Sequence, residues 1–102
     1  MKKKLLDVAH EIATDLHAVN AIDAQTMLEF DAKCLPPVKN YGPSQIKRIR
    51  LRNRASQAVF AAYLNASPST IRQWEQGQKK PSGISLKVLN LIDHHGLMYI
   101  AV

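Results

Sequence analysis

The sequence predicts an all-α protein in which a helical arm precedes a bundle of short helices. Apolar residues recur at three- and four-residue steps, the spacing that places side chains on one face of a helix. Capping residues and prolines stand where these periodic segments begin, and glycines stand where they end. The length of 102 residues suits one compact domain plus an arm.

The first helix is expected over residues 4–19. Its apolar positions form one stripe, which consists of Leu5, Val8, Ile12, Leu16 and Val19. Three acidic residues lie on another face of the same helix: Asp7, Glu11 and Asp15. Asp23 is expected to be the N-cap of a second short helix that carries Met27, Leu28 and Phe30.

A linker is predicted from Cys34 to Gly42, because the adjacent Pro36 and Pro37 exclude a regular helix there. It separates an N-terminal helical arm, residues 1–40, from a domain over residues 41–102. The arm holds five lysines against six acidic residues, whereas the domain holds nine Lys and Arg residues against two acidic ones. The basic excess suggests a polyanionic partner for the domain and a different role for the arm. Composition alone fits equally well a charge excess that only keeps the protein soluble.

Four helices are predicted in the domain, each with its own start signal. Gly42 and Pro43 begin the first, which runs to about Arg54, and Ser56 caps the second, over residues 57–64. Ser67 caps the third, Pro68 opens it and Gly77 ends it; Ser82 is expected to cap the fourth, which Gly96 closes. The last six residues are expected to form a short strand or another helical turn. The inward positions are expected to be Ile46, Ile49, Val59, Phe60, either Tyr63 or Leu64, Ile71, Trp74, Leu86, Val88, Leu89, Leu91 and Ile92, with Leu51 as an additional candidate.

The second and third helices of the domain are predicted to form a helix-turn-helix. The small side chains of Ala61 and Ala62 allow a close helix crossing, and Ile71 and Trp74, three residues apart, both face inward. The residues left facing outward or lying at the rim are Ser69, Thr70, Arg72, Gln73 and Gln76. Gln can pair with adenine, Arg with guanine, and Ser or Thr with several base edges, so this helix is suited to the DNA major groove.

The stretch over about residues 43–95 resembles the Cro/repressor-like (XRE) helix-turn-helix proteins. The residues that carry the resemblance are Gln57, Ala61, the run 67–71, Trp74, Glu75, Gly77 and Pro81. The resemblance implies that Gln57 contacts a phosphate and that Ser67 contacts the DNA backbone. It also implies that the base-reading positions are Pro68, Ser69 and Gln73, with Thr70 and Arg72 beside them. Pro68 departs from the polar residue often found in the family, and it can offer only apolar contact, for example to a thymine methyl group.

Five cations crowd the helix before the helix-turn-helix: Lys47, Arg48, Arg50, Arg52 and Arg54. Like charges at this spacing repel one another, and a polyanion would relieve the repulsion. The five wrap around the helix, so they cannot all face DNA. The expected phosphate contacts are Arg48, Arg52, Lys79 and Lys80. Arg50 is a candidate for a structural role, and Glu75 for an internal salt bridge or cap.

Within this family the string WEQGQKKPSG followed by ISLKVLNLI, together with the short arm, is most similar to the HigA-type antitoxins. That resemblance implies a homodimer that binds a palindromic double-stranded operator and represses transcription. It also implies that the arm neutralises a protein toxin, an RNA-cleaving one of the RelE-like group. The candidate toxin-binding residues are Leu5, Asp7, Val8, Glu11, Ile12, Asp15 and Leu16. The arm helix could instead pack only on its own domain, and the alternative function is a stand-alone repressor, phage or metabolic, whose arm serves dimerisation.

Other functional classes find no support in the sequence. No nucleophile is paired with a base and no glycine loop precedes a helix, so neither an enzyme nor a cofactor is expected. Cys34, the only cysteine, excludes an internal disulfide and is expected to be an inert, partly buried thiol. His10 and His17 lie two helical turns apart, too far for one metal ion, so no metal is expected. No stretch approaches 18 apolar residues, so no membrane contact and a cytoplasmic location are expected.

Overall fold

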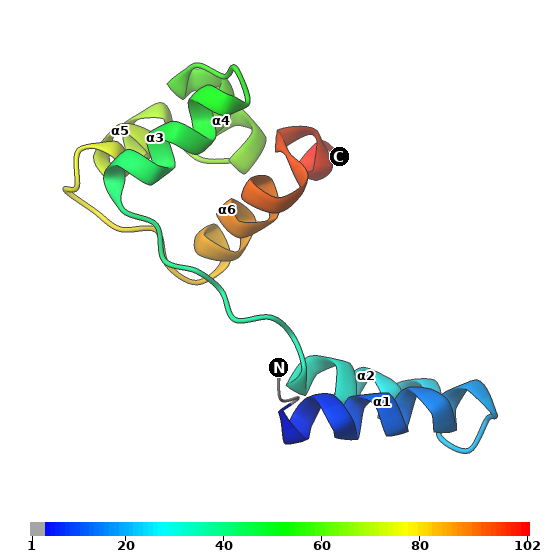
Figure 1. The fold of residues 1–102 in the computed structure, drawn as a ribbon. Coiled ribbons are helices and arrows are strands. Elements are labelled where there is room, and N and C mark those ends of the chain that lie inside the picture. Colours follow the sequence, from blue (N-terminus) through cyan, green and yellow to red (C-terminus); the bar gives the residue numbers. More distant parts are fainter. Residues whose placement is uncertain (1–3) are drawn as a thin grey trace. The chain divides into compact units, whose positions relative to one another are not determined.

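The computed structural model describes residues 4–102, and in this range it contains six α-helices, one 3₁₀ helix and no strand (Figure 1). The fold is therefore all-α, as the sequence predicts. The chain forms two compact units, of which the first ends at Pro37 and the second spans Val38–Val102. Across residues 4–102 no helix is both long and apolar enough to cross a membrane.

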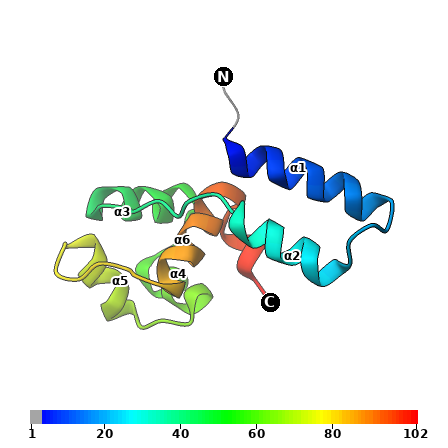
Figure 2. The same cartoon turned by 90° about the horizontal axis from the view of Figure 1, so that it is seen from below.

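The first unit is a helical hairpin of α1 (Leu5–Ala18) and α2 (Ala24–Lys33), which lie side by side in Figures 1 and 2. Asp23 caps α2 as predicted: its carboxylate accepts a hydrogen bond from the backbone N–H of Thr26 at 2.8 Å, and this bond lowers the pKa of Asp23. Between the helices, His10 Nε2 lies 2.5 Å from Asp31 Oδ1. The half-buried Cys34 donates its thiol to the carbonyl of Leu6 at 3.3 Å. These contacts fix the register of the hairpin.

The apolar stripe of α1 remains exposed within this unit. Leu5 is 84% exposed, Ile12 55% and Val19 72%, and on α2 Leu28 is 67% exposed. The only buried residue of the two helices is Ala13, whose small side chain lets them approach. The hairpin therefore packs through a face next to the apolar stripe and leaves the stripe uncovered.

The second unit contains α3 (Pro43–Arg52), α4 (Gln57–Leu64), α5 (Pro68–Glu75), α6 (Ile84–His95) and the 3₁₀ helix η1 (Leu97–Ile100). Three of its predicted starts are confirmed. The side chain of Gln45 accepts from the backbone N–H of Gly42 at 2.7 Å. Ser56 Oγ accepts from the N–H of Val59, and Ser67 Oγ from the N–H of Thr70. Each cap satisfies an N–H that the first helical turn leaves without a partner.

Two predicted boundaries in this unit are wrong. The first helix ends at Arg52 rather than Arg54, because Asn53 folds back onto the carbonyl of Ile49 and Arg54 turns left-handed at φ 56°. The same Asn53 accepts the backbone N–H of Leu97 at 3.0 Å, which ties this bend to η1. The last helix is capped by Gly83, not Ser82, at φ 56° and ψ −126°, a conformation open to glycine. Of the two conformations expected for the chain end, a strand or another helical turn, the structure has the second, a 3₁₀ turn.

The core of the second unit consists mainly of residues that the sequence singles out. The buried members are Ile46, Ile49, Ala55, Phe60, Ala61, Ile71, Trp74, Leu89, Ile92 and Leu97. Val59, expected inside, is 47% exposed, and Leu51, an additional candidate for the core, is 55% exposed. Buried Asn90 was not expected: its side chain accepts from the N–H of Lys39 at 2.9 Å and donates to the carbonyl of Lys39 at 3.0 Å. This amide holds the end of the linker against α6.

Candidate DNA-binding surface

The helix pair α4–α5 is joined by a turn of three residues. Asn65 ends α4 in a left-handed conformation, with φ 55° and ψ 43°, which asparagine tolerates better than most residues. After Ala66, Ser67 caps α5. Phe60 on the first helix and Trp74 on the second are both buried, as the sequence predicts. With its inner face fixed in the core, α5 turns its opposite face to solvent.

The exposed side of α5 carries most of the predicted base-reading residues. Pro68, Ser69 and Arg72 are exposed, and Gln73 is half-buried. Thr70 differs from its neighbours, because its hydroxyl lies 2.9 Å from Ser67 Oγ and belongs to the N-terminal cap. The side chains available along the outer side of α5 are thus a proline ring, a hydroxyl, a guanidinium and an amide.

Below this face a buried ion pair joins α3 to the end of α5. Arg50 donates to Glu75 through Nε at 2.7 Å and through Nη2 at 2.8 Å, and its Nη1 donates to the carbonyl of Ala55 at 3.1 Å. The two side chains are only 10% and 5% exposed. Burial alone would raise the pKa of Glu75, but the hydrogen bonds and charge of Arg50 outweigh it and lower that pKa. The structural roles predicted for Arg50 and Glu75 are confirmed.

Gln57 is connected to the same ion pair. Its Nε2 donates to Glu75 Oε1 at 3.4 Å, so the predicted phosphate-binding amide is attached to the carboxylate that also holds Arg50. Sequence reasoning missed this contact. The buried pair therefore supports the first residue of α4 and the last residue of α5 together.

Arg52, a predicted phosphate contact, lies in a second network. Its Nη2 donates to Asp93 Oδ1 at 2.7 Å and to the Asp93 carbonyl at 3.2 Å. Tyr41 donates its hydroxyl to Asp93 Oδ2 at 2.7 Å. The hydrogen bonds from Arg52 and Tyr41 lower the pKa of Asp93. Burial is the main cause that raises the pKa of Tyr41 to about 12, and its hydrogen bond to Asp93 adds to the effect. This network ties the linker to α3 and α6.

The remaining predicted phosphate contacts are exposed. Arg48 lies on α3, while Lys79 and Lys80 lie in the loop after α5. The loop begins at Gly77, whose φ of +74° favours glycine and whose place for a Cβ lies 3.3 Å from Pro43 Cγ. Gly77 thus lets the two lysines follow α5 closely.

Among the described residues, no group of three or more His, Cys, Asp or Glu side chains is placed to hold a metal ion.

Residues 46–90 match the family model described as helix-turn-helix. Over 56 residues the chain is 38% identical to the protein named antitoxin HigA-2 of Vibrio cholerae serotype O1 (strain ATCC 39315 / El Tor Inaba N16961). That alignment covers 55% of the chain and 54% of the relative, so the chain spans about half the length of the relative it matches.

Proposed function

The chain carries a helix-turn-helix domain of the XRE family over residues 46–90, as its sequence predicts, and on this premise we propose that it is a DNA-binding transcriptional repressor and antitoxin. Two copies bind one palindromic operator in the bacterial cytoplasm. The observation that carries the proposal is the outer face of α5, where Ser69, Arg72 and Gln73 stand opposite the buried Ile71 and Trp74. A helix with this division of faces fits the major groove.

In the proposed complex the outer face of α5 reads base edges. Gln73 offers a donor paired with an acceptor, Arg72 paired donors, Ser69 a hydroxyl, and Pro68 an apolar contact. Thr70 supports them through its cap with Ser67, and its methyl group can reach a base as well. These contacts would give the sequence preference.

Phosphate contacts hold the domain on the duplex and carry no sequence information. They are made by Gln57 and Ser67 at the two helix starts and by Arg48, Lys79 and Lys80 around them. Arg52 uses Nη2 for both of its bonds to Asp93, so it would reach a phosphate through Nε or Nη1.

We propose that the arm binds a basic protein toxin, an RNA-cleaving one of the RelE-like group. The stripe of α1 is apolar and uncovered within the hairpin, with Val8 at 38%, Ile12 at 55% and Leu16 at 41% exposed. Asp7, Glu11 and Asp15 follow one edge of the stripe by helical spacing. An apolar face with an acidic edge complements a cationic cleft with an apolar floor.

DNA binding is tested by selecting bound duplexes from a random pool with the full chain. The proposal expects a palindromic sequence to be enriched and bound at least ~1,000-fold more tightly than random duplex at the same salt concentration. Binding that shows no preference at any base pair would contradict it, since surplus positive charge alone produces such binding.

Toxin binding is tested by co-expression with the product of the neighbouring reading frame. The full chain should co-purify with a small basic protein and protect cells from it. Ile12→Glu should abolish both effects, whereas the control Gln25→Glu, which adds the same charge on an exposed position of α2, should preserve them. If no partner is retained and Ile12→Glu instead separates two copies of the chain, the arm is the dimerisation element of a stand-alone repressor.

A further inference from the structure

Two side chains of α6 hold the end of the linker in place. Asn90 accepts from the backbone N–H of Lys39 at 2.9 Å and donates to the carbonyl of Lys39 at 3.0 Å. Two residues later, Tyr41 donates its hydroxyl to Asp93 at 2.7 Å. The bonds at Lys39 use only its backbone, and Lys39 is exposed. The linker therefore presents the cationic side chain of Lys39 from a fixed backbone.

The loop that follows α5 is fixed beside the same end of the linker. The backbone N–H groups of Gln78 and Lys79 both donate to the carbonyl of Gln73, at 2.9 Å and 3.3 Å. At the start of the loop, a Cβ placed on Gly77 would lie 3.3 Å from Pro43 Cγ, so the loop and the start of α3 are in close contact. The loop thus connects α5, with its proposed base-reading face, to the residues that follow the linker.

A groove lies between the linker and this loop. It has a volume of about 510 Å³, and we call it the linker–loop groove. The residues that line it are Asn40, Tyr41, Gly42, Pro43, Lys80 and Pro81. A smaller hollow of about 110 Å³ shares most of these residues and adds Lys79 and Trp74 to the walls. Of the polar side chains along the groove, those of Asn40, Lys79 and Lys80 belong to exposed residues.

Charge indicates which ligand the groove suits. Both acidic residues of the second unit, Glu75 and Asp93, are paired with an arginine. Lys39, Lys79 and Lys80 are exposed on the two sides of the groove, and no acidic residue lines it. Cations on both sides of a groove attract a polyanion that runs along it, and a nucleic-acid backbone is such a polyanion.

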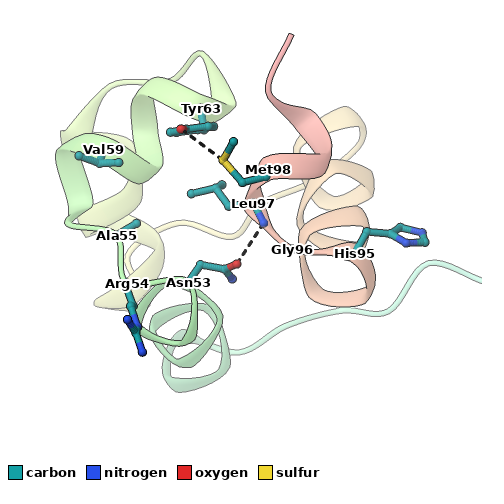
Figure 3. A pocket seen from close by; sticks show the side chains of 9 residues that line it. All are labelled: Asn53, Arg54, Ala55, Val59, Tyr63, His95, Gly96, Leu97 and Met98. Carbon is teal, nitrogen blue, oxygen red and sulfur yellow. Dashed lines mark hydrogen bonds between the residues drawn. The ribbon is translucent and has the colours of Figure 1, made fainter.

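A second hollow of the same unit lacks this pattern. It has a volume of about 340 Å³, and Val59, Leu97 and Met98 are among its lining residues (Figure 3). Its basic members are Arg54 and His95, and Figure 3 shows both side chains pointing out of it. Of these two hollows, the linker–loop groove is therefore the one suited to a polyanion.

We propose that the linker–loop groove binds the phosphodiester backbone of the DNA duplex whose bases α5 reads. Lys39 and Asn40 contact phosphates from the linker, while Lys80 contacts them from the loop. Asn90 is a positioning residue, because its two bonds fix the backbone of Lys39. The inference rests on the proposed function, and it adds the linker to the DNA-binding surface.

The test compares full-length variants on a random duplex at several salt concentrations. Lys39→Gln removes one charge but keeps both backbone bonds to Asn90, so its circular dichroism and thermal midpoint should match those of the wild type. It should reduce the slope of log affinity against log salt by about one per bound domain. Lys39→Arg should keep the wild-type slope. The control Lys33→Gln removes the same charge from an exposed position of α2 and should keep it too.

A second measurement locates the contact on the selected operator. Single phosphates are replaced one at a time by neutral methylphosphonates. At one or two positions per half-site, the replacement should weaken binding of the wild type and leave binding of Lys39→Gln unchanged. Asn40→Asp, which adds a carboxylate to the groove, should weaken binding to operator and random duplex alike.

An unaltered slope in Lys39→Gln would overturn the inference, and so would an equal reduction in Lys33→Gln, because the charge of the chain would then act without the groove. Methylphosphonates that weaken both proteins equally at every position would also overturn it. Failure of the proposed function is distinguishable, because the wild type would then show no sequence preference, whereas the slopes on random duplex would still test the groove. Sequence preference that persists beside an unaltered slope removes only the linker–loop groove.

Discussion

Replacing Glu75 with Met tests the buried ion pair that joins α3 to the end of α5. The substitution keeps a side chain of similar length in the core but removes the carboxylate that accepts two bonds from Arg50 and one from Gln57. Arg50, whose side chain is 10% exposed, then keeps only its bond to the carbonyl of Ala55. A buried cation without its counter-ion is the main cost of the change.

The expected loss in the free energy of unfolding is about 3 kcal/mol, the lower end of the range for breaking a buried pair, because Arg50 keeps one acceptor. For a unit of this size that corresponds to a drop in the thermal midpoint of roughly 12–24 °C. Since small domains are stable by only about 5–15 kcal/mol, the variant loses a large share of its stability.

Urea unfolding of the single variants Glu75→Met and Arg50→Met and of the double variant measures the coupling. The double variant should be more stable than either single variant, because it leaves neither charge unpaired. The control is Arg52→Met, which breaks a pair whose side chains are 54% and 23% exposed and should cost less than about 1 kcal/mol. A Glu75→Met variant no less stable than the control, or a double variant whose loss equals the sum of the single losses, would refute the reasoning.

Three further predictions concern the proposed contacts and the effect of acid. Gln73→Ala should cost about 1–3 kcal/mol on the selected operator and relax preference at one base pair per half-site, measured on single-base operator variants; an unchanged preference would remove Gln73 from base reading. Replacing Lys79 and Lys80 with Ala should weaken binding to operator and random duplex alike and reduce the slope of log affinity against log salt by about two per half-site. An unaltered slope would mean that the two lysines face only solvent. Glu75 and Asp93 have lowered pKa values in the folded protein, so each contributes stability that is present above its ordinary pKa, 4.5 and 3.8 respectively, and is lost as the pH falls through the folded value. The urea concentration at the unfolding midpoint should therefore decrease once the pH is lowered from 6 to below about 4.5. A midpoint that does not change with pH would contradict the ion pairs.

The helix-turn-helix could be predicted because its signals are local. Ser56 and Ser67 each bond to an N–H three residues further along the chain, and this spacing is visible in the sequence. Ile71 and Trp74 share one face of α5 through helical geometry alone. The outward residues of α5 could be predicted as well, because they occupy the face opposite Ile71 and Trp74.

The features that sequence reasoning missed depend on distant parts of the chain. Val59 lies on a helix that is apolar all round, so the helical period could not show which side the unit leaves open. Gly83 replaces the expected cap at Ser82 because the loop enters α6 with a positive φ, which the residue order alone does not set.

What the sequence by itself determined is therefore the all-α class, most of the helix starts, the buried face of α5 and the concentration of positive charge in the domain. Only the tertiary structure decided which charges are paired and which apolar faces stay open. Arg52 forms hydrogen bonds with Asp93, which lies 41 residues further along the chain, and Asn90 does so with Lys39, 51 residues before it. Caps and periodicity act within one or two helical turns, whereas these pairings depend on how α6 packs against α3 and the linker, and no local pattern encodes that packing.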